Sequence, residues 1–199
     1  PTPTPTPTPT PAPTPTPTIA NSNGAEVPSP TLAEDRTWSG QMTLNKTKMT
    51  FDLYGDKAPQ AVANFVSLVN KGFYEKNSCH RLTVAQMFVL QCGDPNGDGS
   101  GGPGYNWGPI ENAPTDNLYQ EGVLAMARVG GNASSMGSQF FIVYKDSTIP
   151  SDAVGGYTVF GKITKGLSGL DKIIKAGTED GSGDGKPAVA TKLGAIVLK

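Results

Sequence analysis

The residues best suited to chemistry lie in two segments, from Cys79 to Asp94 and from Gly137 to Val143. The first combines a cation, Arg81, with aromatic and amide side chains in a mostly apolar run, and a glycine-rich loop follows it. Neither segment contains a nucleophile with its base, a metal-binding cluster or a phosphate-binding loop. Our interpretation, which the rest of the chain has to support, is a peptide groove in which one arginine does the chemistry as a fixed cation.

His80 is the only histidine, so a histidine-dependent triad or a zinc site would have to use it. It lies inside an apolar strand pattern, and we expect its ring to make a structural hydrogen bond. Two loops that begin at Asp94 and Asp180 resemble the start of a calcium-binding EF-hand loop, but their twelfth positions are Tyr105 and Thr191 instead of glutamate. We expect neither a metal ion nor another cofactor.

Cys79 and Cys92 are the only cysteines, and an exported chain could join them in a disulfide. If Arg81 lies opposite Gln91 in an antiparallel pair of strands, Cys79 lies opposite Gly93. The two thiols then point to opposite faces of the sheet, which argues against a disulfide. The loop between the strands could change this register, so the sequence leaves the pairing open.

The beginning of the chain differs from the rest in composition. Residues 1–18 alternate Pro and Thr apart from Ala12, and they have no apolar face to bury. We expect an extended, polyproline-II-like spacer there. Residues 19–36 lack periodicity, so the prediction is a disordered stalk or linker over residues 1–36 and one folded domain over residues 37–199. Such stalks hold domains away from a cell surface, which favours a secreted or envelope-anchored protein.

Charge and hydropathy narrow the classes of partner. The chain has 199 residues and a formal net charge of −1, which gives no electrostatic reason for binding nucleic acid or an anionic membrane. No apolar run approaches the roughly 18–20 residues of a membrane span. We expect a monomer with no nucleic-acid partner and no direct membrane span.

The periodicity of apolar residues predicts a fold dominated by β-strands. Eight strands are expected, over residues 38–44, 49–54, 78–83, 87–93, 122–128, 139–144, 157–163 and 190–198. Helical spacing predicts two helices, one from Pro59 to about Lys71 and one over Leu167–Lys175. Many short strands with glycine-rich turns favour a barrel whose ends are covered by the helices.

Six segments, in this order and at about this spacing, resemble the cyclophilins, the cyclosporin-binding class of peptidyl-prolyl cis-trans isomerases. These segments are His80-Arg81, Phe88–Pro95, Gly97–Tyr105, Leu124–Ala127, Gly137–Ile142 and Val159–Lys162. The resemblance extends from about Thr37 to Lys199 and is closest to the exported bacterial branch, especially that of actinobacteria. It implies an eight-stranded antiparallel closed β-barrel capped by two α-helices, and an activity that rotates X–Pro peptide bonds and assists protein folding.

The resemblance also implies roles for ten residues. The catalytic residues would be Arg81, Gln91 and Phe141. The substrate-binding residues would be Phe88, Val89, Ala127, Arg128, Val129, Gln139 and Tyr157. Phe88, Val89 and Phe141 would form the proline pocket.

Two further groups would position the peptide. The backbone of residues 127–129 would pair with it, and Gln91 and Gln139 would orient it. Tyr157 stands where the family usually has a pocket histidine, and Arg128 stands in place of the common asparagine.

Three features depart from the family. The link over residues 82–87 and the loop over residues 130–136 are each two residues longer than usual. The tryptophan that contacts cyclosporin is missing, and Ile149 or Pro150, within residues 146–152, lies nearest to its position. We therefore expect at most weak binding of cyclosporin-like ligands, whereas isomerase activity depends less on that residue.

The expected partners are proline-containing polypeptides. An alternative to an isomerase is a binding module at the cell surface that holds proline-containing peptides without useful turnover. The complete set of Arg81, Gln91 and Phe141 favours the isomerase. A third hypothesis is that the Pro/Thr tail enters the groove itself, although a simple stalk explains the tail more directly.

Overall fold

The computed structural model describes residues 25–199, and the alternating Pro/Thr stretch lies outside these residues. Eight strands correspond to the predicted ones: β1 (Thr37–Leu44), β2 (Thr47–Tyr54), β3 (Arg81–Thr83), β4 (Val89–Cys92), β6 (Val123–Met126), β7 (Phe140–Val143), β9 (Val159–Lys165) and β11 (Leu193–Leu198). Three two-residue strands are additional: β5 (Leu118–Tyr119), β8 (Ser147–Thr148) and β10 (Asp184–Gly185). The helices are η1 (Pro30–Ala33), α1 (Pro59–Asn70), η2 (Leu167–Leu170) and α2 (Asp171–Ala176).

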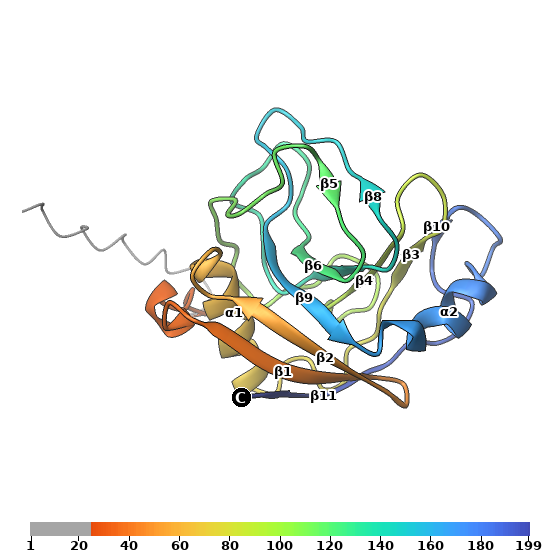
Figure 1. The fold of residues 1–199 in the computed structure, drawn as a ribbon, viewed down its shortest axis with the longest axis horizontal. Helices are drawn as coiled ribbons and strands as arrows, with labels where there is room; N and C mark the ends of the chain where they lie inside the picture. Colours follow the sequence, from red (N-terminus) through yellow and green to blue (C-terminus); the bar gives the residue numbers. More distant parts are fainter. Residues whose placement is uncertain (1–24) are drawn as a thin grey trace, which may run out of the picture.

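Nine strands form one strongly curled sheet in the order β10-β3-β4-β7-β6-β9-β2-β1-β11, and β5 pairs with β8 above it (Figure 1). All paired strands are antiparallel. A single bridge between Ser78 and Lys192 joins the segment before β3 to the segment before β11. The β3 side of the sheet therefore meets the β11 side through one bridge and not through a full ladder. The predicted β-dominated fold with two helices is confirmed.

The period-two alternation of the strands divides the apolar residues between two faces. On β7, Phe140 and Ile142 belong to the main core inside the curl, where Phe65 of α1 packs on Phe140 with ring centroids 5.6 Å apart. Phe141 and Val143 point the other way, into a smaller apolar cluster on the outer face. This outer cluster forms one wall of the candidate site.

Helix α1 begins at Pro59, in agreement with the prediction, and has no side-chain cap of its own. Instead, the Glu111 carboxylate accepts hydrogen bonds from the backbone N–H groups of Gln60 and Ala61, at 3.0 and 2.9 Å. These two N–H groups would otherwise lack partners at the helix start. A carboxylate from a distant loop thus caps the helix, and its negative charge interacts favourably with the positive end of the helix dipole.

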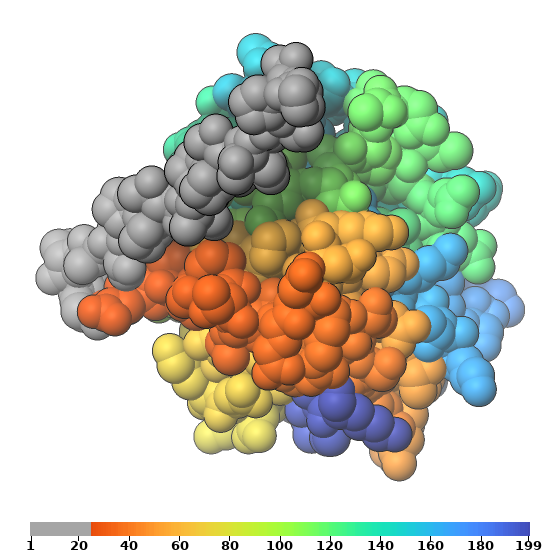
Figure 2. All heavy atoms as spheres, turned by 60° about the vertical axis from the view of Figure 1, so that its left-hand side comes forward, coloured from red at the N-terminus to blue at the C-terminus, as the bar shows by residue number. Residues whose placement is uncertain are grey.

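The packed part of the chain begins before Thr37, where we expected the domain to start. Ala33 is fully buried, and its carbonyl accepts a hydrogen bond of 2.8 Å from the Trp38 indole. Gln60 of α1 donates to the carbonyl of Pro28 at 2.9 Å. Figure 2 shows the red-orange start of the described chain packed against the paler orange region that contains α1. A single turn of 3₁₀-helix is too short to show periodicity, so the sequence pattern did not reveal it.

Strands β3 and β4 pair in the predicted register, with Arg81 opposite Gln91. Cys79 and Cys92 nevertheless form a disulfide, so the expectation that their thiols point apart was wrong. Just before β3, the His80 N–H bonds to the carbonyl of Gln91 at 3.0 Å. Just after β4, Gly93 has φ of 89°. The regular alternation of side chains ends at these positions, and both cysteines are buried in the same core.

Candidate active site

A pocket of about 130 Å³, lined by both apolar and polar side chains, lies on the outer face of the sheet. Its lining comes from β3, β4, the end of β6, β7 and the segment after β8: Arg81, Met87, Val89, Gln91, Ala127, Arg128, Phe141, Ile149 and Tyr157. This volume is far below the roughly 300–1,000 Å³ of sites for drug-sized ligands. The pocket therefore has room for one small apolar group beside a cation and an amide.

A second hollow of about 340 Å³ adjoins the pocket and shares Gln91, Ala127 and Arg128 with it. The glycine-rich loop after β4 and the segment over residues 135–139 line its other sides. Val129, a large apolar side chain that is 65% exposed, stands on its edge. The pocket and the hollow together form a continuous groove that could hold an extended peptide.

Arg81 extends along the pocket wall and makes a two-pronged ion pair. Its Nε donates to Asp184 Oδ1 at 2.7 Å, and its Nη2 donates to Asp184 Oδ2 at 2.6 Å. The third nitrogen, Nη1, donates to Gln91 Oε1 at 3.3 Å. The hydrogen bond that Arg81 donates to Asp184 raises the pKa of Arg81 above its ordinary value, so the guanidinium stays charged.

Two glutamines continue the hydrogen bonds from Arg81 across the groove floor. Gln91 Nε2 donates to Gln139 Oε1 at 2.8 Å, and Gln139 Nε2 donates to the carbonyls of Gly99 and Gly101, each at 2.8 Å. A guanidinium only donates and a carbonyl only accepts, so this chain has one consistent direction. Both amide groups are therefore fixed in orientation.

Asp94 holds the glycine-rich loop that ends this chain. Its buried carboxylate accepts hydrogen bonds from the backbone N–H groups of Asn96, Asp98 and Gly99. The carboxylate at the start of this acidic loop is thus engaged by backbone N–H groups of the loop itself, not arranged as a calcium ligand. Within residues 25–199, no group of three or more His, Cys, Asp or Glu side chains is arranged to bind a metal ion.

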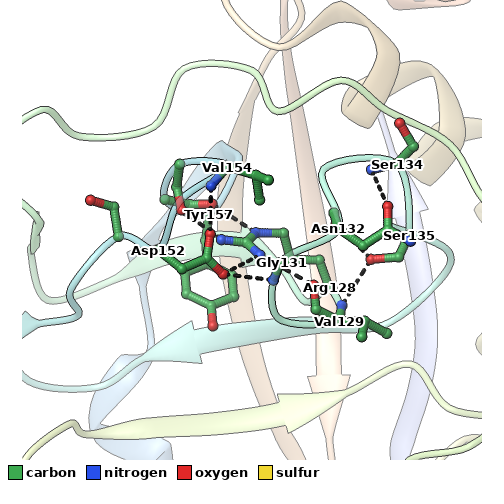
Figure 3. Close-up of polar contacts among 12 residues, drawn as sticks. Arg128, Val129, Gly131, Asn132, Ser134, Ser135, Asp152, Val154 and Tyr157 are labelled. Carbon is green, nitrogen blue, oxygen red and sulfur yellow. Dashed lines mark hydrogen bonds and ion pairs between the residues drawn. The ribbon is translucent and has the colours of Figure 1, made fainter.

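The side chain of Arg128 points toward Asp152 and Tyr157 and is only 1% exposed (Figure 3). It donates to the carbonyls of Gly155 and Gly156 at 2.6 and 2.9 Å and to Asp152 Oδ2 at 2.9 Å. Its guanidinium carbon also lies 4.9 Å from the centroid of the Tyr157 ring. Arg128 therefore connects the end of β6 to the segment that carries the pocket residue Tyr157.

Asp152 joins a second loop to the same point. Its carboxylate accepts hydrogen bonds from the N–H groups of Gly131, at 2.9 Å, and Val154, at 3.0 Å (Figure 3). The hydrogen bond from Arg128 is the main cause that holds the pKa of Asp152 well below its usual range. The longer loop over residues 130–136 is thus attached to the rim of the groove.

A family model described as cyclophilin type peptidyl-prolyl cis-trans isomerase/CLD matches residues 40–195, which include every residue that lines the pocket. The chain belongs to the cyclophilin family. The chain is also 44% identical over 174 residues to the probable peptidyl-prolyl cis-trans isomerase B of Mycobacterium tuberculosis (strain ATCC 25618 / H37Rv), with 80% of this chain and 54% of the relative covered. It therefore spans about half the length of that relative.

Three further comparisons agree. The cyclophilin is 44% identical over 121 residues to peptidyl-prolyl cis-trans isomerase B of Bacillus subtilis (strain 168), with 60% of this chain and 78% of the relative covered. A crystal structure of a Cryptosporidium parvum cyclophilin type isomerase has a TM-score of 0.68 and 27% identity, with 82% of this chain and 98% of that chain covered. A structure of that protein in the presence of the dipeptide Ala-Pro has a TM-score of 0.67 and 28% identity.

Nine of the ten predicted site residues line the groove of this cyclophilin, and Phe88 does not. The Phe88 ring packs against Tyr144, with centroids 6.0 Å apart, and lies 4.4 Å from the Lys145 ammonium. Met87 lines the pocket in its place. Phe88 precedes Val89 by one residue, so the alternation of the strand directs it to the opposite face. Ile149, one of the two expected neighbours of the missing tryptophan, lines the pocket.

The sequence did not identify two supporting residues, Asp184 and Tyr119. The Tyr119 hydroxyl accepts a hydrogen bond of 2.7 Å from the backbone N–H of Tyr157, and its ring centroid lies 6.4 Å from that of Phe141. Tyr119 is fully buried behind the pocket wall. It lies on the two-residue strand β5, which has no clear pattern in the sequence.

His80 does not make the structural hydrogen bond that we expected for its ring. In the part of the chain that the structure describes, neither ring nitrogen has a hydrogen-bond partner. Burial lowers the pKa of the imidazole, which favours the neutral form. His80 is therefore a packed residue beside the disulfide, and its backbone, not its ring, supports the strand that carries Arg81.

Proposed function

We propose that this domain is a peptidyl-prolyl cis-trans isomerase that assists protein folding. The observation that supports this most directly is a fixed guanidinium, Arg81, at the wall of a small pocket that also presents apolar side chains. The crystallisation of a structural relative in the presence of Ala-Pro fits a pocket that accepts a proline ring. Met87, Val89, Phe141 and Ile149 provide the apolar surface for that ring.

The reaction requires stabilisation of a twisted amide. An X–Pro bond resists rotation by about 18–20 kcal/mol because the nitrogen shares its lone pair with the carbonyl. In the twisted transition state the nitrogen regains that lone pair. A cation directed at the nitrogen therefore stabilises the twisted state more than the planar one, as catalysis requires. Arg81 acts in this way without transferring a proton or forming a covalent bond.

The groove also holds the rest of the peptide. Among the described residues, no hydrogen bond uses the backbone N–H or the carbonyl of Arg128. Both groups lie between the pocket and the second hollow, so they are available to pair with an extended peptide. Gln91 and Gln139, fixed by their own hydrogen bonds, orient the peptide carbonyls. The proline ring stays in the pocket while the chain on its other side rotates.

Replacement of Arg81 by alanine tests the assignment. The loss of one preorganised electrostatic group costs about 10²–10³ in rate in other enzymes. We expect a similar loss of isomerisation of a proline tetrapeptide, measured by NMR exchange, with an unchanged thermal melting curve. Arg36→Ala, which removes a surface arginine that is 41% exposed, is the control and should retain full activity. Full turnover by Arg81→Ala would refute the role of the arginine, whereas a wild type that binds the peptide without turnover would indicate the binding module.

The disulfide between Cys79 and Cys92 supports a location outside the cytoplasm, since disulfides persist in oxidising compartments. In the described part of the chain, no helix is long and apolar enough to cross a bilayer. We propose a monomer that acts on proline-containing polypeptides and binds cyclosporin-like ligands weakly at most. Ile149 offers neither the ring nor the indole N–H of the missing tryptophan.

A further inference from the structure

Asp184 lies on β10, the two-residue strand at one edge of the sheet. It pairs with Thr83 of β3, and Gly185 pairs with Leu82. Arg81 is two residues from Thr83 and therefore points to the same face. It is a diagonal neighbour of Asp184, at a distance that long side chains can bridge. The backbone pairing thus directs the carboxylate at the guanidinium.

The contact fixes the plane of the guanidinium. Both oxygens of Asp184 are engaged, one by Nε and one by Nη2 of Arg81, in the fork geometry that suits a carboxylate. Nη1 is left for Gln91 and the pocket. The Arg81 side chain is 38% exposed, so without this pair little packing would hold it in one rotamer.

The loop before β10 is braced so that the carboxylate is held in place. The Ser182 hydroxyl donates to Asp180 Oδ1 at 2.6 Å and contacts the carbonyl of Asp184 at 2.9 Å. The Val84 N–H donates to the carbonyl of Gly183 at 2.9 Å and joins the loop to the end of β3. The acidic, glycine-rich segment that resembled a calcium loop thus presents one carboxylate to Arg81.

We propose that Asp184 is a positioning residue for Arg81 that holds the guanidinium in the plane in which Nη1 faces the groove. This inference rests on the proposed isomerase function. A cation that is already oriented needs no reorganisation in the transition state, which is the main source of electrostatic catalysis. Asp184 therefore increases turnover through Arg81 and does not touch the substrate.

Asp184 could also have an opposite effect on turnover, so the direction in which turnover changes after its removal is informative. The negative charge of Asp184 weakens the field of Arg81 at the substrate nitrogen, so its removal could accelerate the reaction by electrostatics alone. Positioning predicts slower turnover after removal of the charge, and field weakening predicts faster turnover. The two sides of the pair are 38% and 50% exposed, and water screens the charge of such a pair strongly. We therefore expect positioning to dominate.

Asp184→Asn keeps the size of the side chain but can offer only one acceptor to the fork. We expect kcat/KM to fall about fivefold, which corresponds to about 1 kcal/mol, with most of the loss in kcat. The matched control is Glu179→Gln, which removes one negative charge from the same loop. Glu179 pairs with Lys186 at 2.8 Å, and both are exposed. We expect the control to change kcat/KM by less than about 1.5-fold.

The ¹H–¹⁵N signal of the Arg81 Nε–H, assigned with Arg81→Ala, reports the pair directly. We expect it to move to the position of exposed arginines in Asp184→Asn and to stay unchanged in Glu179→Gln. If the wild type is an active isomerase, unchanged or faster turnover of Asp184→Asn would overturn the role of Asp184 and leave the proposed function intact. An unmoved Nε–H signal in that variant would do the same. An inactive wild type would overturn the proposed function and, with it, the role of Asp184 in turnover.

Discussion

Arg128 holds two loops at the rim of the groove, and its replacement by methionine tests how much that contact stabilises the domain. Methionine keeps an apolar stem but removes the charge and every N–H donor. Two of the lost hydrogen bonds join the guanidinium to the carbonyls of Gly155 and Gly156. A hydrogen bond to a charged group contributes about 1.5–3 kcal/mol. Because carbonyls at a rim can bind water instead, we take the lower value for each and expect a loss of about 3 kcal/mol.

Thermal unfolding is the suitable assay. In a domain of this size, each kcal/mol lowers Tm by about 2–4 °C. Arg128→Met should therefore melt about 6–12 °C below the wild type. Because the guanidinium supports the Tyr157 ring at 4.9 Å, we also expect weaker peptide binding at temperatures where the variant is folded.

Arg36→Met is the matched control because Arg36 makes the same kinds of contact on the surface. Arg36 pairs with Glu34 at 2.7 Å, and its guanidinium carbon lies 3.7 Å from the centroid of the Trp38 ring. Its side chain is 41% exposed, and exposed ion pairs contribute about 0–1 kcal/mol. Its Tm should fall by less than about 4 °C. Equal losses for the two variants would refute the argument from burial.

Two further predictions concern the disulfide and the histidine. The paired Cys79→Ser/Cys92→Ser variant should lose about 3 kcal/mol of unfolding free energy on the chain-entropy model, because the bridge spans 13 residues. Urea unfolding with and without reductant measures this loss, and insensitivity of the wild type to reductant would contradict it. The lowered pKa of His80 means that the unfolded state binds more protons below about pH 6.5. The free energy of unfolding should be highest above that pH and fall as the pH drops below it, more steeply in the wild type than in His80→Gln. Parallel pH profiles of the unfolding free energy for the two proteins would refute this.

The sequence predicted the fold well because short apolar runs between turn residues mark its strands. These runs revealed eight strands of three to eight residues, and the spacing from Pro59 revealed α1. The two-residue strands β5, β8 and β10 could not be predicted, because only tertiary pairing defines strands so short. The same reason hid the packed segment before Thr37, where one apolar side chain, Ala33, is fully buried.

The sequence predicted those site residues whose position follows from the local pattern of their own strand. Arg81, Gln91 and Phe141 follow from strand alternation together with the family resemblance. Phe88 was misplaced because its role was taken from the family resemblance, whereas strand alternation puts Met87 and Val89 on the pocket face and Phe88 on the opposite face. Asp184 was missed because it lies 103 residues from Arg81 and reaches it through an edge strand that the sequence does not indicate. The sequence left the disulfide open because alternation, extended past the start of β3, placed the two thiols on opposite faces.

The arrangement around Arg81 fits a reaction that transfers no proton. A general acid or base needs a pKa near the working pH, whereas the pKa of Arg81 is raised and its charge does not vary. The rate then depends on where the cation points, and three segments determine this: β10 through Asp184, β4 through Gln91, and the glycine-rich loop through Gln139. The disulfide joins Cys79, just before β3, to Cys92, the last residue of β4, so it stabilises the pair of strands that carries Arg81 and Gln91. Substitution of the residues that position Arg81 should therefore change the turnover rate but leave the shape of its pH profile nearly unchanged.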